Sequence, residues 1–320
     1  MSGFSFVERG APMVDLGLVV ARLLHYAAVT LLAGVAVFPL YAYAVAEPKE
    51  LSHRRHAVLL AAAIGTVLSG LLWFVFAVAN MSGTLADVAD KEVLWTVLSE
   101  TTFGGVWMAR MLLAVVIASV MANRPLGAGT AGRDVAAACL AAALMASLAG
   151  TGHAQIEEGW LSVAHVALDA MHLLAAGGWL GGLFPLGFIL LDYSTRADAP
   201  IVDVDRILLR FSSMGYVAVV TLIVSGLVNS WFMVGSVSSL LNTSYGQILL
   251  AKLALFAAML ALAVANRFWL VPRMIEARNS AQPSFWLGRL RYHVLGEQFL
   301  GLMILLAVPV LGTMRPAVGQ

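Results

Sequence analysis

The sequence predicts an all-α fold, a polytopic bundle of about eight membrane-spanning helices. Residues of the AVILMFWYC set make up 61% of the 320 residues and charged residues 12%, whereas soluble domains average about 45–50% and about 25%. The mean hydropathy is +0.88, and the apolar residues fall into eight stretches long enough to cross roughly 30 Å of hydrocarbon. Lipid is therefore the expected solvent, which excludes a soluble enzyme and a disordered chain. A net charge of +1 leaves no basic surface for nucleic acid.

In chain order, the expected spans cover residues 16–46, 57–80, 104–123, 134–152, 162–191, 211–234, 247–269 and 294–313. The first and fifth exceed the roughly 20 residues that a crossing needs, which indicates tilt or an interfacial extension. Residues 81–103 form an outer loop with the apolar spacing of an amphipathic helix, expected to pack at the membrane surface. The other connections are short, so residues 1–320 are predicted to form a single integral membrane domain.

The basic residues predict how the bundle is oriented. Alternate connections carry thirteen of them: Lys49, Arg54, Arg55, Arg124, Arg133, Arg196, Arg206, Arg210, Arg267, Arg273, Arg278, Arg289 and Arg291. The opposite side carries three: Arg9, Lys91 and Arg315. Because cytoplasmic loops carry the excess of Lys and Arg, both termini are expected outside, in the periplasm.

The fifth span carries a polar stripe at membrane depth. His165, Asp169 and His172 are spaced four and three residues apart, so they share one helix face. Such residues are costly in lipid and usually functional. The two imidazoles are about 10 Å apart along the helix, too far to bind one ion directly. Either they are successive stations on a path, or each joins a ligand from another helix, with Asp169 orienting a histidine or acting as a ligand.

Two more histidines complete the candidate metal ligands. His153 lies at the outer end of the fourth span, and His25 lies about 13 Å into the first span, counted at 1.5 Å per residue. His172 has a similar depth, so His25 and His172 are predicted to face each other near the midplane. The single cysteine, Cys139, excludes a disulfide framework and any cluster of thiolate ligands.

Four charged residues also fall within spans. Arg22, Arg110 and Lys252 each lie about 7–9 Å from the outer end of their spans. They either extend to the headgroups or face the interior, where they would suit a bound anion such as the propionates of a haem. Glu297 lies four residues after His293 near the inner end of the last span, where the two are predicted to form an exit site for a cation.

A glycine-rich run follows the stripe on the fifth span. Residues 177–182 contain two overlapping G-x-x-x-G spacings, which let neighbouring helix backbones approach closely. Helix packing is the preferred interpretation, and it places the fifth span centrally in the bundle. Pro185, just beyond the run, is expected to kink this helix.

Several motifs, in this order and spacing, resemble the CopD-type family of copper resistance and copper transport membrane proteins. They are Ala21-Arg22-Leu23-Leu24-His25-Tyr26, Thr151-Gly152-His153-Ala154, Asp169-Ala170-Met171-His172-Leu173-Leu174 with Trp179-Leu180-Gly181-Gly182-Leu183, Phe211-Ser212 with Ser225-Gly226-Leu227-Val228-Asn229, Tyr245-Gly246 with Lys252-Leu253, Asn266-Arg267, and Glu297. His153 and His172 match the motif histidines best. His165 does not map onto the family pattern, so its role rests on the helical stripe.

The resemblance implies a multi-pass protein of the bacterial cytoplasmic membrane that carries periplasmic copper inward, with a separate CopC-type copper-binding protein as its donor. Imidazole binds both oxidation states of copper. A transporter rather than an enzyme is expected, and the absence of a Walker motif argues against direct use of ATP.

Two rival functions remain open. One is a haem-b electron-transfer protein, a membrane copper or quinone reductase, with His25 and His172 as axial ligands and Arg22, Arg110 or Lys252 holding the propionates. The other is a structural or assembly factor for respiratory complexes, which would bind neither metal nor pigment.

Overall fold

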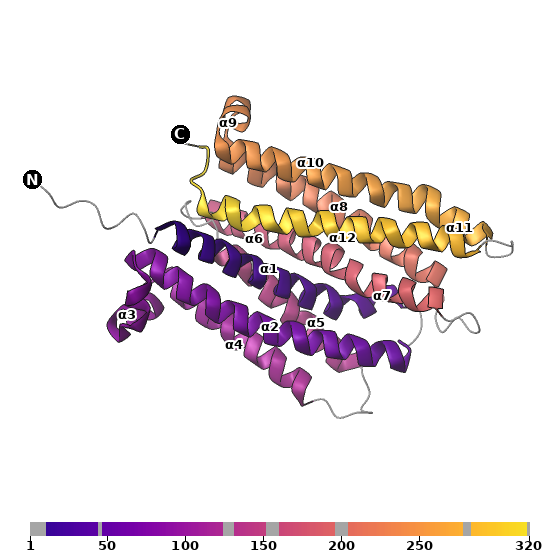
Figure 1. Ribbon diagram of the computed structural model, residues 1–320, viewed down its shortest axis with the longest axis horizontal. Coiled ribbons are helices and arrows are strands. Elements are labelled where there is room, and N and C mark those ends of the chain that lie inside the picture. Colours follow the sequence, from indigo (N-terminus) through magenta and orange to yellow (C-terminus); the bar gives the residue numbers. More distant parts are fainter. Residues whose placement is uncertain are drawn as a thin grey trace, which may run out of the picture.

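A computed structural model describes residues 11–43, 47–123, 131–151, 160–195, 204–277 and 283–318, and within these ranges every regular element is helical (Figure 1). The α-helices are α1 (Ala11–Ala42), α2 (Lys49–Ser82), α3 (Lys91–Glu100), α4 (Thr102–Ala122), α5 (Ala131–Ala146), α6 (Trp160–Ala176), α7 (Gly182–Thr195), α8 (Val204–Val234), α9 (Val237–Asn242), α10 (Ser244–Ala265), α11 (Val271–Ala277) and α12 (Pro283–Thr313). Short 3-10 turns η1 (Leu85–Ala89) and η2 (Ser147–Thr151) and π-turns η4 (Gly177–Gly181) and η5 (Asn266–Leu270) join some of them.

Eight stretches of the described residues are long and apolar enough to cross a membrane, which confirms the predicted number. They are Met13–Ala42, Lys49–Ser82, Thr102–Ala122, Gly132–Ala149, Ser162–Asp192, Val204–Val234, Ser244–Ala277 and Phe285–Thr313. The largest differences from the expected limits lie at the ends rich in Arg and Lys, where α2, α8 and α12 begin earlier than hydropathy predicts. Lys and Arg are good helix formers, so a helix continues past the point where its apolar pattern stops.

Helix α1 lies at the centre of the bundle. It packs against α2 and α5 on one side and against α7, α8, η4 and α12 on the other. Figure 1 shows α2, α4 and α5 below α1 and α8, α10 and α12 above it. The apolar core is correspondingly divided into two clusters, one built mainly on α1, α2, α4 and α5 and one on α7, α8, α10, α11 and α12, and both include residues of α1.

The glycine-rich run packs closely against a neighbouring helix, as predicted, and the structure shows that this helix is α1. A Cβ on Gly34 of α1 would strike the backbone of Gly181 and Gly182, and a Cβ on Gly181 would strike the carbonyl of Thr30 and the backbone of Gly34. The π-turn at residues 177–181 ends four residues before Pro185, which lacks an N–H and would clash with a regular carbonyl at Gly181. The fifth span therefore changes its hydrogen-bonding pattern there, rather than breaking.

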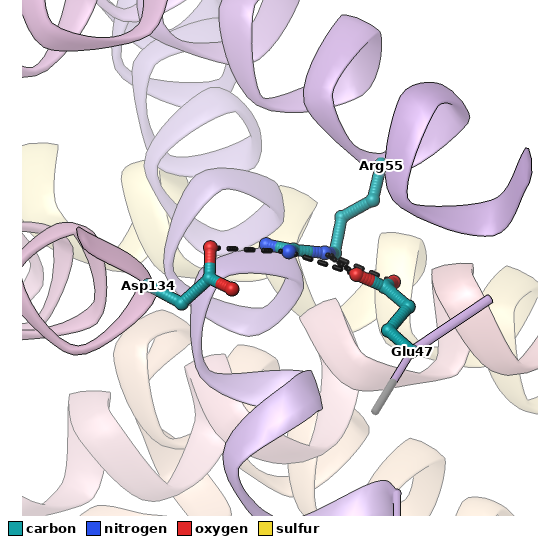
Figure 2. A network of polar contacts seen from close by, with 3 residues as sticks. All are labelled: Glu47, Arg55 and Asp134. Carbon is teal, nitrogen blue, oxygen red and sulfur yellow. Dashed lines mark hydrogen bonds and ion pairs between the residues drawn. The ribbon is translucent and has the colours of Figure 1, made fainter. Parts of the chain in front are cut away.

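Ion pairs link the first turns of α2 to α5 and α7 at one end of the bundle. Arg55 of α2 donates from Nε to both carboxylate oxygens of Glu47, at 3.0 and 2.9 Å, and from Nη2 to Asp134 of α5 at 3.1 Å (Figure 2). The Arg55 side chain is only 4% exposed. Its neighbour Arg54 pairs with Asp192 of α7 at 2.7 Å, but in a site where the arginine side chain is 49% exposed.

Residues 81–103 contain η1 and α3, which confirms the helical character predicted for this loop. Val97 of α3 is buried against Phe74 and Val78 of α2, while Trp95 on the opposite face is 68% exposed. One face of the short helix is therefore anchored to the bundle, and the other is free to meet the membrane surface.

Candidate functional site

The polar residues predicted at membrane depth form three groups in the structure. The first surrounds His25 on α1, and the side chain of this histidine is fully buried. Its Nδ1 lies 3.1 Å from Oγ of Ser69 on α2. Its ring centroid lies 5.4 Å from the ring centroid of Trp73, which follows Ser69 by one turn of α2. We call this group the His25 cluster; it also includes Arg22 and Arg110.

Ser69 determines which nitrogen of His25 carries the proton. Its hydroxyl lies 2.6 Å from the carbonyl oxygen of Gly65, a distance at which the hydroxyl must donate, because a carbonyl has no hydrogen. Nδ1 of His25 is then the donor to Ser69, and Nε2 carries a lone pair. Nε2 is buried and has no hydrogen-bond partner among the residues that the structure describes.

Two arginines flank the indole of Trp73 in the His25 cluster. Arg22 and Arg110 place their guanidinium carbons 5.5 and 5.0 Å from its ring centroid, within the range of a cation–π contact. Arg110 is fully buried and donates to the hydroxyl and the carbonyl of Ser147, at 3.1 and 2.7 Å. Of the two predicted alternatives, Arg110 thus faces the interior. Arg22 is partly buried and donates to the carbonyl of Gly312 on α12 at 3.0 Å.

The second group is the stripe on α6, and all three of its residues face α8. His165 stacks on Phe232, with ring centroids 4.6 Å apart. Asp169 accepts a hydrogen bond from Asn229 at 3.2 Å. Nδ1 of His172 lies 2.9 Å from Oγ of Ser225. Along α8 the partners Ser225, Asn229 and Phe232 are spaced four and three residues apart, and they meet the residues of α6 in the opposite chain order. We call this antiparallel set of contacts the α6–α8 ladder.

The ladder holds His172 in the same tautomer as His25. The hydroxyl of Ser225 lies 2.5 Å from the carbonyl oxygen of Thr221, so it donates there and accepts from Nδ1 of His172. Nε2 of His172 is left with its lone pair. The tautomer that offers Nε2, with Nδ1–H fixed by a neighbour, is the usual form of a metal-binding histidine in proteins.

Lys252 of α10 adds a charge beside the ladder. It interacts electrostatically with Asp169 and with His172, and His165 interacts in the same way with Asp169. Lys252 is partly buried, so of the two alternatives for this residue the structure favours an interior position. The stripe is therefore a mixed site of two imidazoles, one carboxylate and one ammonium.

The third group surrounds Glu297 on α12, which is 3% exposed. Asn266 donates to its carboxylate at 2.5 Å, and the side chain of Trp179 also hydrogen-bonds to it. Trp179 lies in η4 and Asn266 in η5, so both π-turns meet at this carboxylate. The three residues line a pocket that also includes Tyr216 and Arg267. The sequence predicted Glu297 with His293 as an exit site, but the structure gives Glu297 these two other partners.

The candidate residues do not form a compact metal centre. Within the described ranges, no three His, Cys, Asp or Glu side chains converge closely enough to hold an ion. His153 lies outside the described residues. Sequence reasoning did not single out Ser69, and it named Ser225 only as part of a family motif and without a role. Neither serine is ionisable, and a serine in a helix usually bonds only to its own backbone.

These features define a helical membrane protein with two histidines at membrane depth, each held at Nδ1 by a serine of a neighbouring helix. Residues 13–163 match the family described as copper resistance protein D-like, N-terminal domain, and residues 205–311 match the family described as copper resistance protein D. The chain is 31% identical to copper resistance protein D of Pseudomonas syringae pv. tomato, over 93% of this chain and 96% of that protein. It therefore belongs to the copper resistance protein D family.

Two further relatives have related names. Inner membrane protein YebZ of Escherichia coli (strain K12) is 29% identical over 92% of this chain and 97% of its own length. Copper transport protein CutJ of Bacillus subtilis (strain 168) is 28% identical over 81% of this chain but only 48% of its own length. No solved structure matches the chain.

Proposed function

We propose that this protein transports copper inward across the bacterial cytoplasmic membrane through a histidine-lined path in the helix bundle. The observation that carries the proposal is the hydrogen bonding of the two deep histidines, because Ser69 and Ser225 leave Nε2 of His25 and His172 available as copper ligands. The names of two relatives, copper resistance protein D and copper transport protein CutJ, support copper as the ion.

The chemistry of the side chains suits transient binding of a copper ion. A conducting site must bind well enough to admit the ion and weakly enough to release it, which favours several sparse sites over one closed cage. His153, His165, Asp169 and His172 would serve as successive stations, with His25 beside them and Glu297 as the exit site. Asp169 would offset part of the positive charge that Lys252 brings to the path.

The orientation of the protein in the membrane bears on where copper enters and what delivers it. The distribution of Lys and Arg supports an arrangement with both termini in the periplasm, and the relative named as an inner membrane protein supports the cytoplasmic membrane as its location. A CopC-type periplasmic protein would deliver the copper. The membrane potential or an ion gradient would drive the transport.

Copper accumulation in cells tests the proposal. Cells that express the wild-type protein should take up copper faster than cells that lack it, and His172→Ala should reduce uptake to the level of the latter. His53→Ala is the matched control, because His53 is exposed on α2 and belongs to none of the three groups. Undiminished uptake by a properly inserted His172→Ala variant would refute the proposed path.

A second candidate function is favoured by the cations beside His25. Arg22 and Arg110 both lie against Trp73, next to that histidine, and their positive charge would suit the propionates of a haem. In this alternative His25 and His172, whose rings bond to different helices, α2 and α8, would turn toward one haem b between them, and Lys252 would contribute to the propionate site. The absorption spectrum of the purified protein distinguishes the two functions, since only the second predicts a Soret band.

A further inference from the structure

We infer that the chain is a tandem repeat of one four-span unit, and that each unit holds its own copper-binding histidine site. The first unit consists of α1, α2, α4 and α5, and the second of the fifth span (α6 to α7), α8, the seventh span (α10 to α11) and α12. The identity of the ligand rests on the proposed function; the repeat itself rests on the contacts described below.

The third span of each unit begins with the same cap. A short helix, α3 or α9, precedes it, and Thr101 or Thr243 then accepts a hydrogen bond from the amide of a glycine three residues on, Gly104 or Gly246, at 3.0 Å in both cases. A Cβ on either glycine would strike the backbone of the preceding short helix. The two turns therefore have the same construction.

A basic residue occupies the same place after each cap. Arg110 is nine residues after Thr101, and Lys252 is nine residues after Thr243. Each interacts electrostatically with the deep histidine of its own unit, Arg110 with His25 and Lys252 with His172. At nine residues, the basic side chain lies about 13 Å beyond the cap in both units.

The histidine of each unit bonds to the serine of a Ser-Gly pair on the second span. The pairs are Ser69-Gly70 on α2 for His25 and Ser225-Gly226 on α8 for His172. A Cβ on Gly70 would lie 3.3 Å from Cε1 of His25, and one on Gly226 would lie 3.6 Å from Cε1 of His172. In both units the glycine therefore lies directly beside Cε1 of the histidine ring, although the atoms closest to Gly70 belong to the side chain of Met111.

A second contact is repeated one turn away on both helices. The residue three before the histidine meets the residue four after the serine: Arg22 lies over Trp73 in the first unit, and Asp169 accepts from Asn229 in the second. The positions are equivalent although the residues differ. The first site therefore has two basic neighbours, whereas the second has one basic and one acidic neighbour.

The repeat predicts the geometry and affinity of two sites. Four spans return the chain to its starting side, so the second unit enters the membrane in the same direction as the first, as in the parallel repeats of transporters. The two histidines then lie at the same depth but on separate helix pairs. Because Asp169 favours a cation and Arg22 opposes one, the site at His172 should bind copper more tightly than the site at His25.

Copper binding to the purified full-length protein in detergent tests this inference. The number of Cu(I) ions bound per chain would be measured in competition with a chromophoric chelator for the wild type, His25→Gln, His172→Gln and the double variant. Each single substitution should remove one ion and the double substitution two, and the ion lost with His172 should be the more tightly bound of the pair. His53→Gln should change nothing.

The alternative is a single site that the two histidines share. In that case either single substitution would remove the same ion, and the double substitution would remove no more; this outcome would overturn the inference of two sites but leave the proposed transport intact. The proposed function itself would be refuted if the wild-type protein bound no copper and did not raise the copper uptake of cells above that of cells that lack it. Elution of each variant as a monodisperse species would show that it has folded.

Discussion

Ser225 accepts a hydrogen bond from Nδ1 of His172 at 2.9 Å while it donates its own proton to the carbonyl of Thr221. The serine is thus not a ligand but a positioning residue, since it fixes both the tautomer and the direction of the imidazole. Neighbours of this kind usually alter metal affinity by about 10–100-fold when removed. The same arrangement at Ser69 and His25 indicates that positioning by serine is part of both sites.

Ser225→Ala should therefore weaken copper binding by about 10–100-fold without removing a ligand. The imidazole would lose the acceptor for Nδ1–H and would sample the other tautomer, in which Nε2 carries the proton. Ser213→Ala is a suitable control, because Ser213 on the same helix is also bonded to a carbonyl one turn back but contacts no histidine. Ser225→Thr retains the hydroxyl and should retain the affinity; equal binding by the Ala and Thr variants would contradict the positioning role.

Glu297→Gln should slow copper transport while leaving binding at the deep histidines unchanged. The substitution keeps the size of the side chain and its bond from Asn266 but removes the charge that would attract a cation leaving the path. Initial rates of uptake measure the effect, and copper stoichiometry measures the binding. Glu276→Gln, at an exposed position near the end of α11, is the control. A normal rate for Glu297→Gln would remove this residue from the path.

Arg55→Met should destabilise the bundle far more than Arg54→Met. Arg55 is buried between Glu47 and Asp134 (Figure 2), so its removal leaves two carboxylates without their cation, at a cost of about 3–5 kcal/mol. Arg54 pairs with Asp192 in an exposed position, where an ion pair contributes about 0–1 kcal/mol. Unfolding in detergent would measure both. Similar losses for the two neighbours would show that burial does not determine the strength of this network.

Gly181→Ala should lower stability by about 1–3 kcal/mol, the usual cost of overpacking. The added methyl group would meet the carbonyl of Thr30 and the backbone of Gly34, neither of which moves without displacing α1. Gly178→Ala provides the comparison, because its nearest neighbour beyond its own helix is Sδ of Met214 at an ordinary 3.7 Å. Alanine is the better helix former, so this control should be neutral or slightly stabilising. A stable Gly181→Ala variant would contradict the close contact with α1.

Hydropathy alone predicted the number and order of the spans, because a crossing helix must be apolar over most of its length whatever it packs against. The ends were less accurate. The described α2 begins at Lys49 and α12 at Pro283, whereas the apolar pattern begins only at residues 57 and 294. Charged residues continue a helix into the interface without contributing to its hydropathy.

The candidate site was predicted in part. Helical spacing correctly grouped His165, Asp169 and His172 on one face, and the structure shows that this face meets α8. Spacing on one helix cannot identify the partner helix, so it did not reveal Ser225. It also left the direction of Arg110 open, which the burial of this residue against Trp73 and Ser147 decides.

The sequence by itself determined that lipid surrounds the chain, how many times the chain crosses, and which few polar residues lie at membrane depth. These are properties of single segments, governed by the cost of placing a polar or charged group in hydrocarbon. Only the tertiary structure decided which helices those residues face and which nitrogen of each deep histidine is available. The available nitrogen depends on a hydroxyl supplied by a different helix, and that helix is brought there by packing rather than by any local preference of the chain.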